Sequence, residues 1–226
     1  MLTNMSKKIT NILFIHHAIG WGGAPNSMIH LILGLNKSRY KVQVLLLKNS
    51  IVSQKLDEYH IEYKIASSFF YRYIYKYTSL SKNQSRNVVD YFNIIRCRIC
   101  WYLSNNFFAM RELQKFNADI IHLNSSVLTD WLKPCHAIAK TIMHIRETVY
   151  INPDKRWDKY LKKTINKYAD QIVAISKDSA ESLDLLDKTI IIYNYSYITE
   201  MDELPISRYY SKKVLYLGGT NLIKGF

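Results

Sequence analysis

Turn-forming residues are scarce in this sequence. It holds 7 glycines and 4 prolines among 226 residues, less than half the share in an average protein, which is about 12%. This scarcity argues against a sandwich or barrel of many short strands and favours long regular elements. Hydrophobic residues make up 48% and charged residues 22%, a balance that excludes a disordered or collagen-like chain.

Cysteine is also scarce, with three residues: Cys97, Cys100 and Cys135. An odd, small number cannot build a disulfide framework and suits a reducing cytosol. Cys97 and Cys100 have the C-x-x-C spacing, but neither a second pair nor a histidine cluster completes a zinc site. We therefore expect these two cysteines to share one face of a helix, and we expect no metal.

Long hydrophobic runs are absent near the start. Lys7 and Lys8 precede an apolar stretch, as in a signal peptide, but only residues 12–15 are apolar before His16 and His17. That is shorter than the 7–15 residues of a secretory core, and a spanning helix would have to include three glycines and Pro25. The sequence predicts a cytoplasmic protein without an export signal or a transmembrane helix.

Acidic residues are outnumbered: 31 Lys and Arg face 18 Asp and Glu, for a net charge of +13. This surplus predicts attraction to anions, which include nucleic acid, acidic lipid headgroups and phosphate-bearing substrates. A solvating surface with the Lys, Ile, Asn and Tyr enrichment of codon bias explains the charge equally well. Because no known nucleic-acid motif accompanies it, we expect no nucleic acid as a partner.

Short apolar runs alternate with helical patterns along the chain. Residues 11–15 have no polar alternation, as expected of a central parallel strand covered on both faces. The pattern recurs at 42–47, 61–65, 119–123, 141–145, 170–175 and 189–193. Helical periodicity follows Pro25 and recurs at 127–139, 154–168 and 176–186. This alternation predicts an α/β fold with a doubly wound, mainly parallel, Rossmann-like sheet.

Residues 68–118 are less regular and rich in aromatic and basic side chains. Alternate positions hold Phe69, Tyr71, Tyr73, Tyr75 and Tyr77. One interpretation is a pair of helices whose aromatic residues dock on the sheet. The other is a basic, aromatic surface in peripheral contact with an anionic membrane, since such residues favour headgroup depth. Basic residues outnumber acidic ones in this region: Arg72, Lys76, Lys82, Arg86, Arg96, Arg98, Arg111 and Lys115 against Asp90 and Glu112.

A glycine-rich turn lies between the first strand and its helix, with Gly20, Gly22 and Gly23. Such a turn lets backbone N–H groups approach a phosphate at the helix N-terminus. It is not the dinucleotide fingerprint, because Pro25 stands where the third glycine belongs and Lys48, not an acid, follows the second strand.

Six segments, taken in order, resemble the N-terminal half of a GT-B glycosyltransferase of the family-4 (glycosyltransferase 1/4-like) group. They are ILFIHH at 12–17 with Gly22–Ala24, ADIIHLNSS at 118–126, HIRE at 144–147, ADQIVAIS at 169–176, IIIYN at 190–194 and VLYLGGTNLIKG at 214–225. The resemblance implies a retaining, metal-independent enzyme without cofactor. It would move a sugar from a nucleotide-diphosphate sugar to a glycan or lipid-linked acceptor, in polysaccharide or glycolipid biosynthesis.

The resemblance also implies roles for individual residues. Gly22 and Gly23 would approach the donor phosphates or the reacting sugar. His144 would hydrogen-bond the transferred sugar, with Arg146 and Glu147 beside it as catalytic residues. Lys224 would neutralise the departing diphosphate. Gly219 departs from the pattern, because the family often has Arg there, so half of the usual pair of cations is missing.

The domain division follows from the same pattern. We expect residues 1–200 to form the N-terminal, acceptor-side domain, and residues 201–226 to hold a linker with the first strand and glycine turn of an incomplete donor-binding domain. A strand at 213–217 with no helix after it looks cut off, so we expect this chain alone to be inactive. The alternative is a non-catalytic fragment that serves as a binding or scaffold domain.

Overall fold

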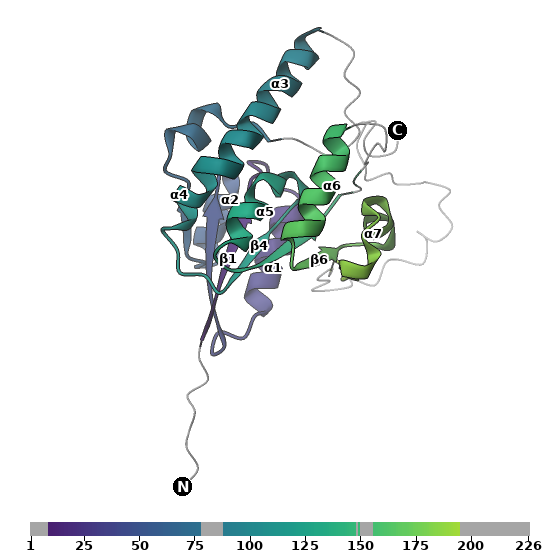
Figure 1. The fold of residues 1–226 in the computed structure, drawn as a ribbon. Coiled ribbons are helices and arrows are strands. Elements are labelled where there is room, and N and C mark those ends of the chain that lie inside the picture. Colours follow the sequence, from purple (N-terminus) through teal and green to yellow (C-terminus); the bar gives the residue numbers. More distant parts are fainter. Residues whose placement is uncertain (1–8, 78–87, 148, 150–155, 195–226) are drawn as a thin grey trace, which may run out of the picture. The chain divides into compact units, whose positions relative to one another are not determined.

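The computed structural model describes residues 9–77, 88–147, 149 and 156–194 (Figure 1). Residues Met1–Tyr193 belong to one compact unit, to which the fold described below belongs. Lys7, Lys8, Lys82 and Arg86 lie outside the described residues, as do the expected strand at 213–217, Gly219 and Lys224. The domain division at residue 200 therefore stays a prediction.

The core of the fold is one sheet in which all neighbouring strands run parallel. Its seven strands lie in the order β3-β2-β1-β4-β5-β6-β7. All seven runs that the sequence identified as strands in this part of the chain are confirmed, although the third, sixth and seventh strands are each two residues shorter than expected. The strands are β1 (Thr10–His16), β2 (Tyr40–Leu46), β3 (Tyr63–Ile65), β4 (Ile120–Leu123), β5 (Lys140–Ile145), β6 (Gln171–Ala174) and β7 (Thr189–Ile191).

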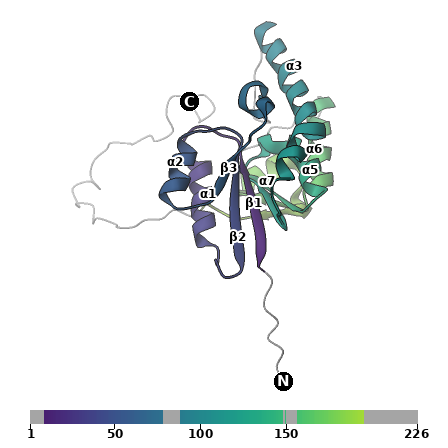
Figure 2. The same ribbon diagram turned by 90° about the vertical axis from the view of Figure 1, so that its left-hand side faces the viewer.

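Helices cover both faces of the sheet, which is why its strands lack polar alternation. On β1, Ile12 and Phe14 pack with α1 (Gly23–Gly34) and α2 (Ile51–Glu58). Leu13 and Ile15 belong to the larger core on the other face, with residues of α5 (Thr129–His136), α6 (Arg156–Tyr168) and α7 (Lys177–Leu183). Figure 2 shows α1 and α2 on one side of the sheet and α5 and α6 on the other. The expected doubly wound α/β fold is confirmed.

The helix boundaries have local causes. Pro25 is buried in the first turn of α1, where its fixed φ suits the helix. Ser176 accepts a hydrogen bond from Ser179 N and so caps α7. The predicted helix at 127–139 begins as a 3-10 turn, η3 (Ser126–Leu128), and continues as α5. A second 3-10 turn, η4 (Leu186–Lys188), precedes β7.

The connection from β3 to β4 is long and helical. It contains η1 (Phe70–Ile74), α3 (Val88–Leu103), η2 (Ser104–Phe108) and α4 (Ala109–Leu113). Cys97 and Cys100 lie one turn apart on α3 as expected, and both are free thiols. Among the five alternating aromatic residues, Tyr71 and Tyr75 are buried while Phe69, Tyr73 and Tyr77 are exposed. Tyr71 and Tyr75 are therefore buried in the core, as the first interpretation expects, while contact with a membrane stays a prediction.

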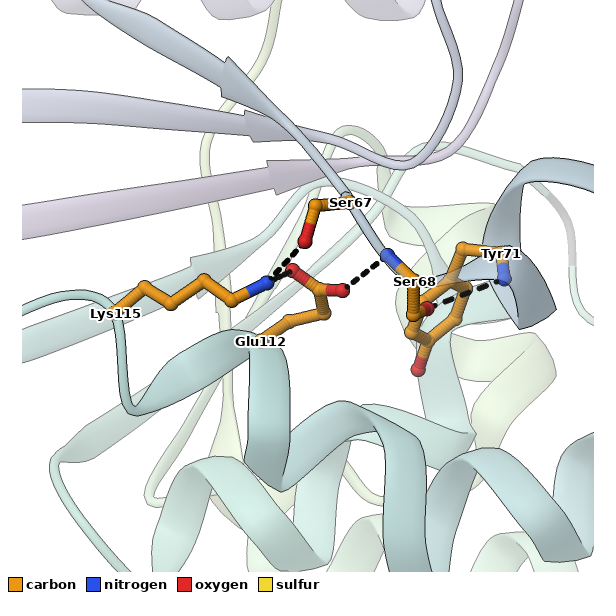
Figure 3. Close-up of polar contacts among 5 residues, drawn as sticks. All are labelled: Ser67, Ser68, Tyr71, Glu112 and Lys115. Atoms are coloured by element: carbon orange, nitrogen blue, oxygen red, sulfur yellow. Dashed lines mark hydrogen bonds and ion pairs between the residues drawn. The ribbon is translucent and has the colours of Figure 1, made fainter.

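A buried carboxylate fastens the start of this connection. Glu112 on α4 is 1% exposed, and its Oε1 accepts a hydrogen bond of 2.9 Å from Ser68 N. Its other oxygen pairs with Lys115 Nζ, which also donates to Ser67 Oγ (Figure 3). A buried carboxylate needs such partners because an isolated charge is costly to desolvate. Glu112 thus holds the segment between β3 and η1 against α4.

Candidate functional site

Polar side chains gather where β1, β4 and β5 end, next to the N-terminus of α1. Since the strand order reverses between β1 and β4, this edge is the topological switch point, where ligands bind in open α/β sheets. His16 ends β1, Asn124 follows β4, and His144 lies near the end of β5 with Arg146 just after it. The structure thus brings Gly22, Gly23, His144 and Arg146 to one edge, as the sequence predicts.

Arg146 spans this edge. Its Nε donates to Asn124 Oδ1 over 2.7 Å, and its Nη1 donates to Ser27 Oγ in α1 over 2.8 Å. Its Nη2 lies 3.3 Å from His144 Nδ1. Burial lowers the pKa of Arg146 to about 10, while the neighbouring Glu147 opposes the shift. The guanidinium therefore stays a cation at neutral pH and is held across the ends of β5 and β4 and the first turns of α1.

Asn124 completes this link. Its Nδ2 donates to the backbone oxygen of Ala24 over 3.2 Å and lies 3.1 Å from His16 Nδ1. Asn124 is fully buried, and its amide joins the end of β1, the start of α1 and Arg146. In the sequence, Asn124 is simply a polar residue directly after an apolar run. Its partners lie about a hundred residues away, so no local pattern announces this role.

The glycine turn leaves the start of α1 open. Gly22 is the N-cap, has an extended backbone and forms no side-chain capping bond. A methyl group built on Gly22 or Gly23 would meet nothing within 4 Å, so the packing of the fold does not require glycine at either position. The first N–H groups of a helix have no intrahelical partner, and the helix dipole adds positive potential there. This turn and Arg146 together can attract an anion.

The histidines at this edge are buried and neutral. His144 is 6% exposed, and its Nδ1 lies 3.3 Å from His122 Nε2. Burial, reinforced by the charge of Arg146, lowers the pKa of His16 and of His144 to about 3; for His16, neighbouring His17 contributes as well. Burial alone lowers the pKa of His17 to about 4. Neutral imidazoles can hydrogen-bond uncharged groups such as sugar hydroxyls.

Several imidazole nitrogens at this edge are unsatisfied. His144 Nε2 and His16 Nε2 are buried without a hydrogen-bond partner in the described part of the chain, as are His17 Nδ1 and His122 Nδ1. Buried polar atoms are usually satisfied, so each such atom calls for an explanation. A ligand that reaches the end of β5 would provide one for His144. The sequence left His16 and His17 undecided and did not single out His122.

Glu147 lies at the same edge of the sheet, but its carboxylate is held by Ser125 and Ser126. Its Oε1 accepts hydrogen bonds from Ser126 N at 3.1 Å and Ser125 Oγ at 3.0 Å, and also from Ser126 Oγ. Its Oε2 accepts from Arg146 N over 3.2 Å. The carboxylate is thus held in the turn before α5. This geometry suits a residue that positions Arg146 better than one that offers a free carboxylate to a substrate.

Two features are absent from the described residues. Those residues contain no group of three or more His, Cys, Asp and Glu side chains able to hold a metal ion. Their helices also include none with the length and hydrophobicity that a membrane span requires. Lys224, the cation expected for the diphosphate, lies outside them.

The fold is similar to one half of several solved glycosyltransferases. HepE of Anabaena, crystallised with UDP, is 14% identical with a TM-score of 0.52, over 82% of this chain and 44% of HepE. The lipopolysaccharide outer core galactosyltransferase WaaB is 13% identical with a TM-score of 0.51, over 81% of this chain and 45% of WaaB. At these identities the likeness shows the fold, which is that of the N-terminal half of GT-B enzymes. The chain spans less than half the length of these proteins.

Comparison of the sequence with family models identifies the family, whereas the structural likeness shows only the fold. No sequence among the curated proteins matches this chain significantly. The model of Glycosyltransferase Family 4 matches residues 21–194, which include Gly22, Gly23, Asn124 and the segment from His144 to Glu147. This match covers well over half of the chain and agrees with the fold. The chain belongs to glycosyltransferase family 4.

Proposed function

We propose that this chain is the acceptor-side part of a retaining glycosyltransferase. The reaction moves a hexosyl group from a nucleotide-diphosphate sugar to a glycan or lipid-linked acceptor, in the biosynthesis of a polysaccharide or glycolipid. The observation that carries the proposal is the placing of Arg146, which is held between His144 and the start of α1 by Asn124 and Ser27. Solved relatives of the same fold bind UDP or UDP-glucose, which supports a nucleotide-sugar donor.

The chemistry of this site follows from charge. As the bond between the anomeric carbon and the diphosphate breaks, negative charge accumulates on the departing phosphate oxygens. Arg146 and the open N–H groups after Gly22 offer preorganised positive potential there, which lowers the barrier more than mobile water does. Lys224 would add a second cation. We assign this stabilisation to protein groups and propose that the reaction needs neither a metal nor a cofactor.

His144 has a different role in the proposal. Because its imidazole stays neutral, it can donate a hydrogen bond to, or accept one from, a hydroxyl of the transferred sugar. Its Nε2 is buried without a hydrogen-bond partner among the described residues, and we propose that a sugar hydroxyl supplies that partner. Glu147 acts through Arg146, since the carboxylate is held by Ser125 and Ser126. It is therefore a positioning residue in this mechanism.

The test of transfer uses the polypeptide that the complete reading frame encodes, with a panel of radiolabelled nucleotide sugars and a membrane extract as acceptor. We expect one donor to label a glycan or lipid, with retention at the anomeric carbon and no loss of activity in EDTA. His144→Ala should lower turnover by about 100-fold, the usual effect of losing one stabilising hydrogen bond, without lowering the melting temperature by a comparable amount.

His136→Ala provides the matched control, because His136 is exposed on α5, away from the strand ends. Wild-type turnover in His144→Ala would refute the role of His144. Binding of glycan without transfer from any donor would instead favour the binding or scaffold domain.

The proposal also places the protein in the cytoplasm, in peripheral contact with the inner face of the cell membrane. Nucleotide sugars are cytoplasmic substrates, and a lipid-linked acceptor would require the chain to approach a bilayer.

A further inference from the structure

Helix α3 is apolar on a face that the other described residues of the chain leave exposed. Cys100 and Trp101 point inward and are 1% and 3% exposed. The opposite side carries large apolar side chains that are 37% to 66% exposed. At about 100° per residue, these residues fall within an arc of about 100°. The arc comprises Tyr91, Phe92, Ile95, Ile99 and Tyr102.

A second set of exposed apolar side chains lies beside α3. It belongs to η1 and its flanks, where Phe69, Tyr73, Ile74 and Tyr77 are 40% to 68% exposed. The backbone oxygen of Ile74 accepts from Arg96 Nη2 at 3.3 Å and from Cys100 Sγ at 3.6 Å. This oxygen therefore joins η1 to the middle of α3. We call the nine residues of the two sets the aromatic face: Phe69, Tyr73, Ile74, Tyr77, Tyr91, Phe92, Ile95, Ile99 and Tyr102.

Buried hydrogen bonds hold η1, which carries part of the aromatic face, against the rest of the fold. Tyr75 donates to Asp130 Oδ2 over 2.9 Å, and the Tyr71 hydroxyl lies 2.7 Å from Ser104 Oγ. These buried contacts fasten η1 to α5 and η2, while Glu112 holds its N-terminal approach (Figure 3). The exposed rings thus belong to an anchored segment and not to a free loop. They place a large apolar surface in contact with water, which is unfavourable and marks an interaction site.

Cations surround the aromatic face. Arg72 and Lys76 are exposed on η1 and just after it, and helical spacing puts Arg96 and Arg98 on opposite sides of the apolar arc of α3. Among the side chains described between residues 66 and 116, the acidic one is Glu112, which is buried and paired with Lys115. Apolar residues with flanking cations, and without an exposed acid among the side chains described there, complement an anionic lipid surface.

The composition distinguishes lipid from nucleic acid. Bases stack on aromatic rings, and isoleucine has no ring on which a base can stack. Ile74, Ile95 and Ile99 stand among the rings of the aromatic face. Branched aliphatic chains gain free energy from hydrocarbon, while Tyr hydroxyls and Arg guanidinium groups remain at headgroup depth. The mixture therefore fits the boundary between headgroups and acyl chains.

We propose that the aromatic face docks on a bilayer that contains anionic lipid, with the rings at the interface and the flanking cations on lipid phosphates. The face also leads to the candidate site, since the Tyr77 ring packs edge-on against His17, with 4.8 Å between centroids. Docking would bring the carboxyl end of β1 near the lipid headgroups. A lipid-linked acceptor would then reach the site without leaving the membrane. The docking itself needs no transferase activity, whereas this last step rests on the proposed function.

Vesicle flotation of the full chain tests the docking. The protein is mixed with phosphatidylcholine vesicles, with or without phosphatidylglycerol, and no nucleotide sugar is present. We expect flotation with the anionic vesicles, reduced by high salt. In the double variant Phe92→Ser, Ile99→Ser, the affinity for these vesicles should fall by about tenfold or more, because each substitution removes a large apolar contact. Arg72→Glu with Lys76→Glu should weaken binding by a similar factor.

The matched controls make comparable charge-reversing and ring-removing substitutions at exposed residues outside the aromatic face. Lys41→Glu with Lys163→Glu gives the same net charge at two exposed lysines outside the aromatic face. Tyr59→Ser with Tyr193→Ser removes two exposed rings outside it, 43% and 70% exposed. Both controls should bind as the wild type does, and melting temperatures should show that all variants fold.

Three results would overturn the docking proposal. One is wild-type protein that floats with neither vesicle, and another is equal weakening in the control variants, which would indicate non-specific charge attraction. The third is loss of self-association or of oligonucleotide binding in the face variants without any vesicle binding, which would assign the surface to another partner. Because the assay contains no donor, failure of sugar transfer and failure of docking are separate outcomes.

Discussion

Arg146 and Asn124 are joined by a hydrogen bond of 2.7 Å between Nε and Oδ1, which links the ends of β5 and β4. Through Ser27 and Ala24 the same pair also fastens the first turns of α1. His16, His144, Arg146 and the start of α1 are therefore joined in a single hydrogen-bonded unit through Asn124 and Ser27. An anion that approaches α1 would meet a cation already held in place.

Loss of this cation should weaken anion binding. Arg146→Met keeps an unbranched apolar stem but removes the charge of the side chain and its bonds to Asn124 and Ser27. Since hydrogen bonds to charged groups contribute about 1.5–3 kcal/mol, the affinity for inorganic pyrophosphate should fall by about tenfold or more in calorimetric titration. Lys163→Met, at an exposed position on α6, should leave it unchanged. Equal affinities in the two variants would contradict an anion site at Arg146.

The glycine turn allows a sharper separation of folding from binding. A methyl group at Gly22 would meet nothing within 4 Å, so Gly22→Ala should change the free energy of unfolding by no more than about 0.5–1 kcal/mol. If the open turn serves to admit a diphosphate, the same substitution should lower pyrophosphate affinity or turnover severalfold. Gly34→Ala, at the other end of α1 and also in open space, is the control. A Gly22→Ala protein that binds and turns over normally would show that ligands do not approach this turn.

The buried histidines predict acid sensitivity. Histidine in the unfolded chain has a pKa of 6.5, whereas burial lowers the pKa of His16 and of His144 to about 3. Between these values the unfolded state binds more protons than the folded state, so the free energy of unfolding should fall as the pH drops below about 6.5. Each such group contributes about 1 kcal/mol per pH unit. Urea unfolding from pH 7.5 to pH 5 should show this slope, and His144→Gln should reduce it. The same slope in His144→Gln and wild type would be the contrary result.

Asp130 has the opposite effect on the pH dependence of the free energy of unfolding. Burial raises the pKa of its carboxyl from 3.8 to about 7, so between these values the folded state binds more protons than the unfolded one. Its contribution to stability is present at low pH and is lost as the pH rises toward 7. Asp130→Asn removes this titration while an amide oxygen can still accept from Tyr75. In urea unfolding, the variant should therefore gain on the wild type between pH 5 and pH 7.5, by about 1 kcal/mol per pH unit up to 7.

Asp187→Asn, at an exposed carboxyl in η4, is the control for that comparison. A difference between Asp130→Asn and wild type that does not change with pH would mean that Asp130 does not titrate in this range.

The region between β3 and β4 shows where prediction from local pattern stops. Alternation of Phe69, Tyr71, Tyr73, Tyr75 and Tyr77 leaves open which rings are buried. In the π-helical turn, Tyr71 and Tyr75 lie one turn apart and face inward, because Ser104 and Asp130 offer partners for their hydroxyls. Those partners are 33 and 55 residues away. The other rings are left outside by the same geometry.

The sequence by itself determined the seven strands, the helices α1, α5, α6 and α7 and the doubly wound class, because apolar runs and helical periodicity report burial over a few neighbouring residues. It also placed Gly22, Gly23, His144 and Arg146 at the ends of strands. Only the tertiary structure decided that Arg146 bonds Asn124 and Ser27, that Glu147 is held by the turn before α5, and that α3 leaves an apolar face uncovered. Such pairings join residues 21 to 119 positions apart. They depend on how strands and helices meet in space, which no local pattern encodes.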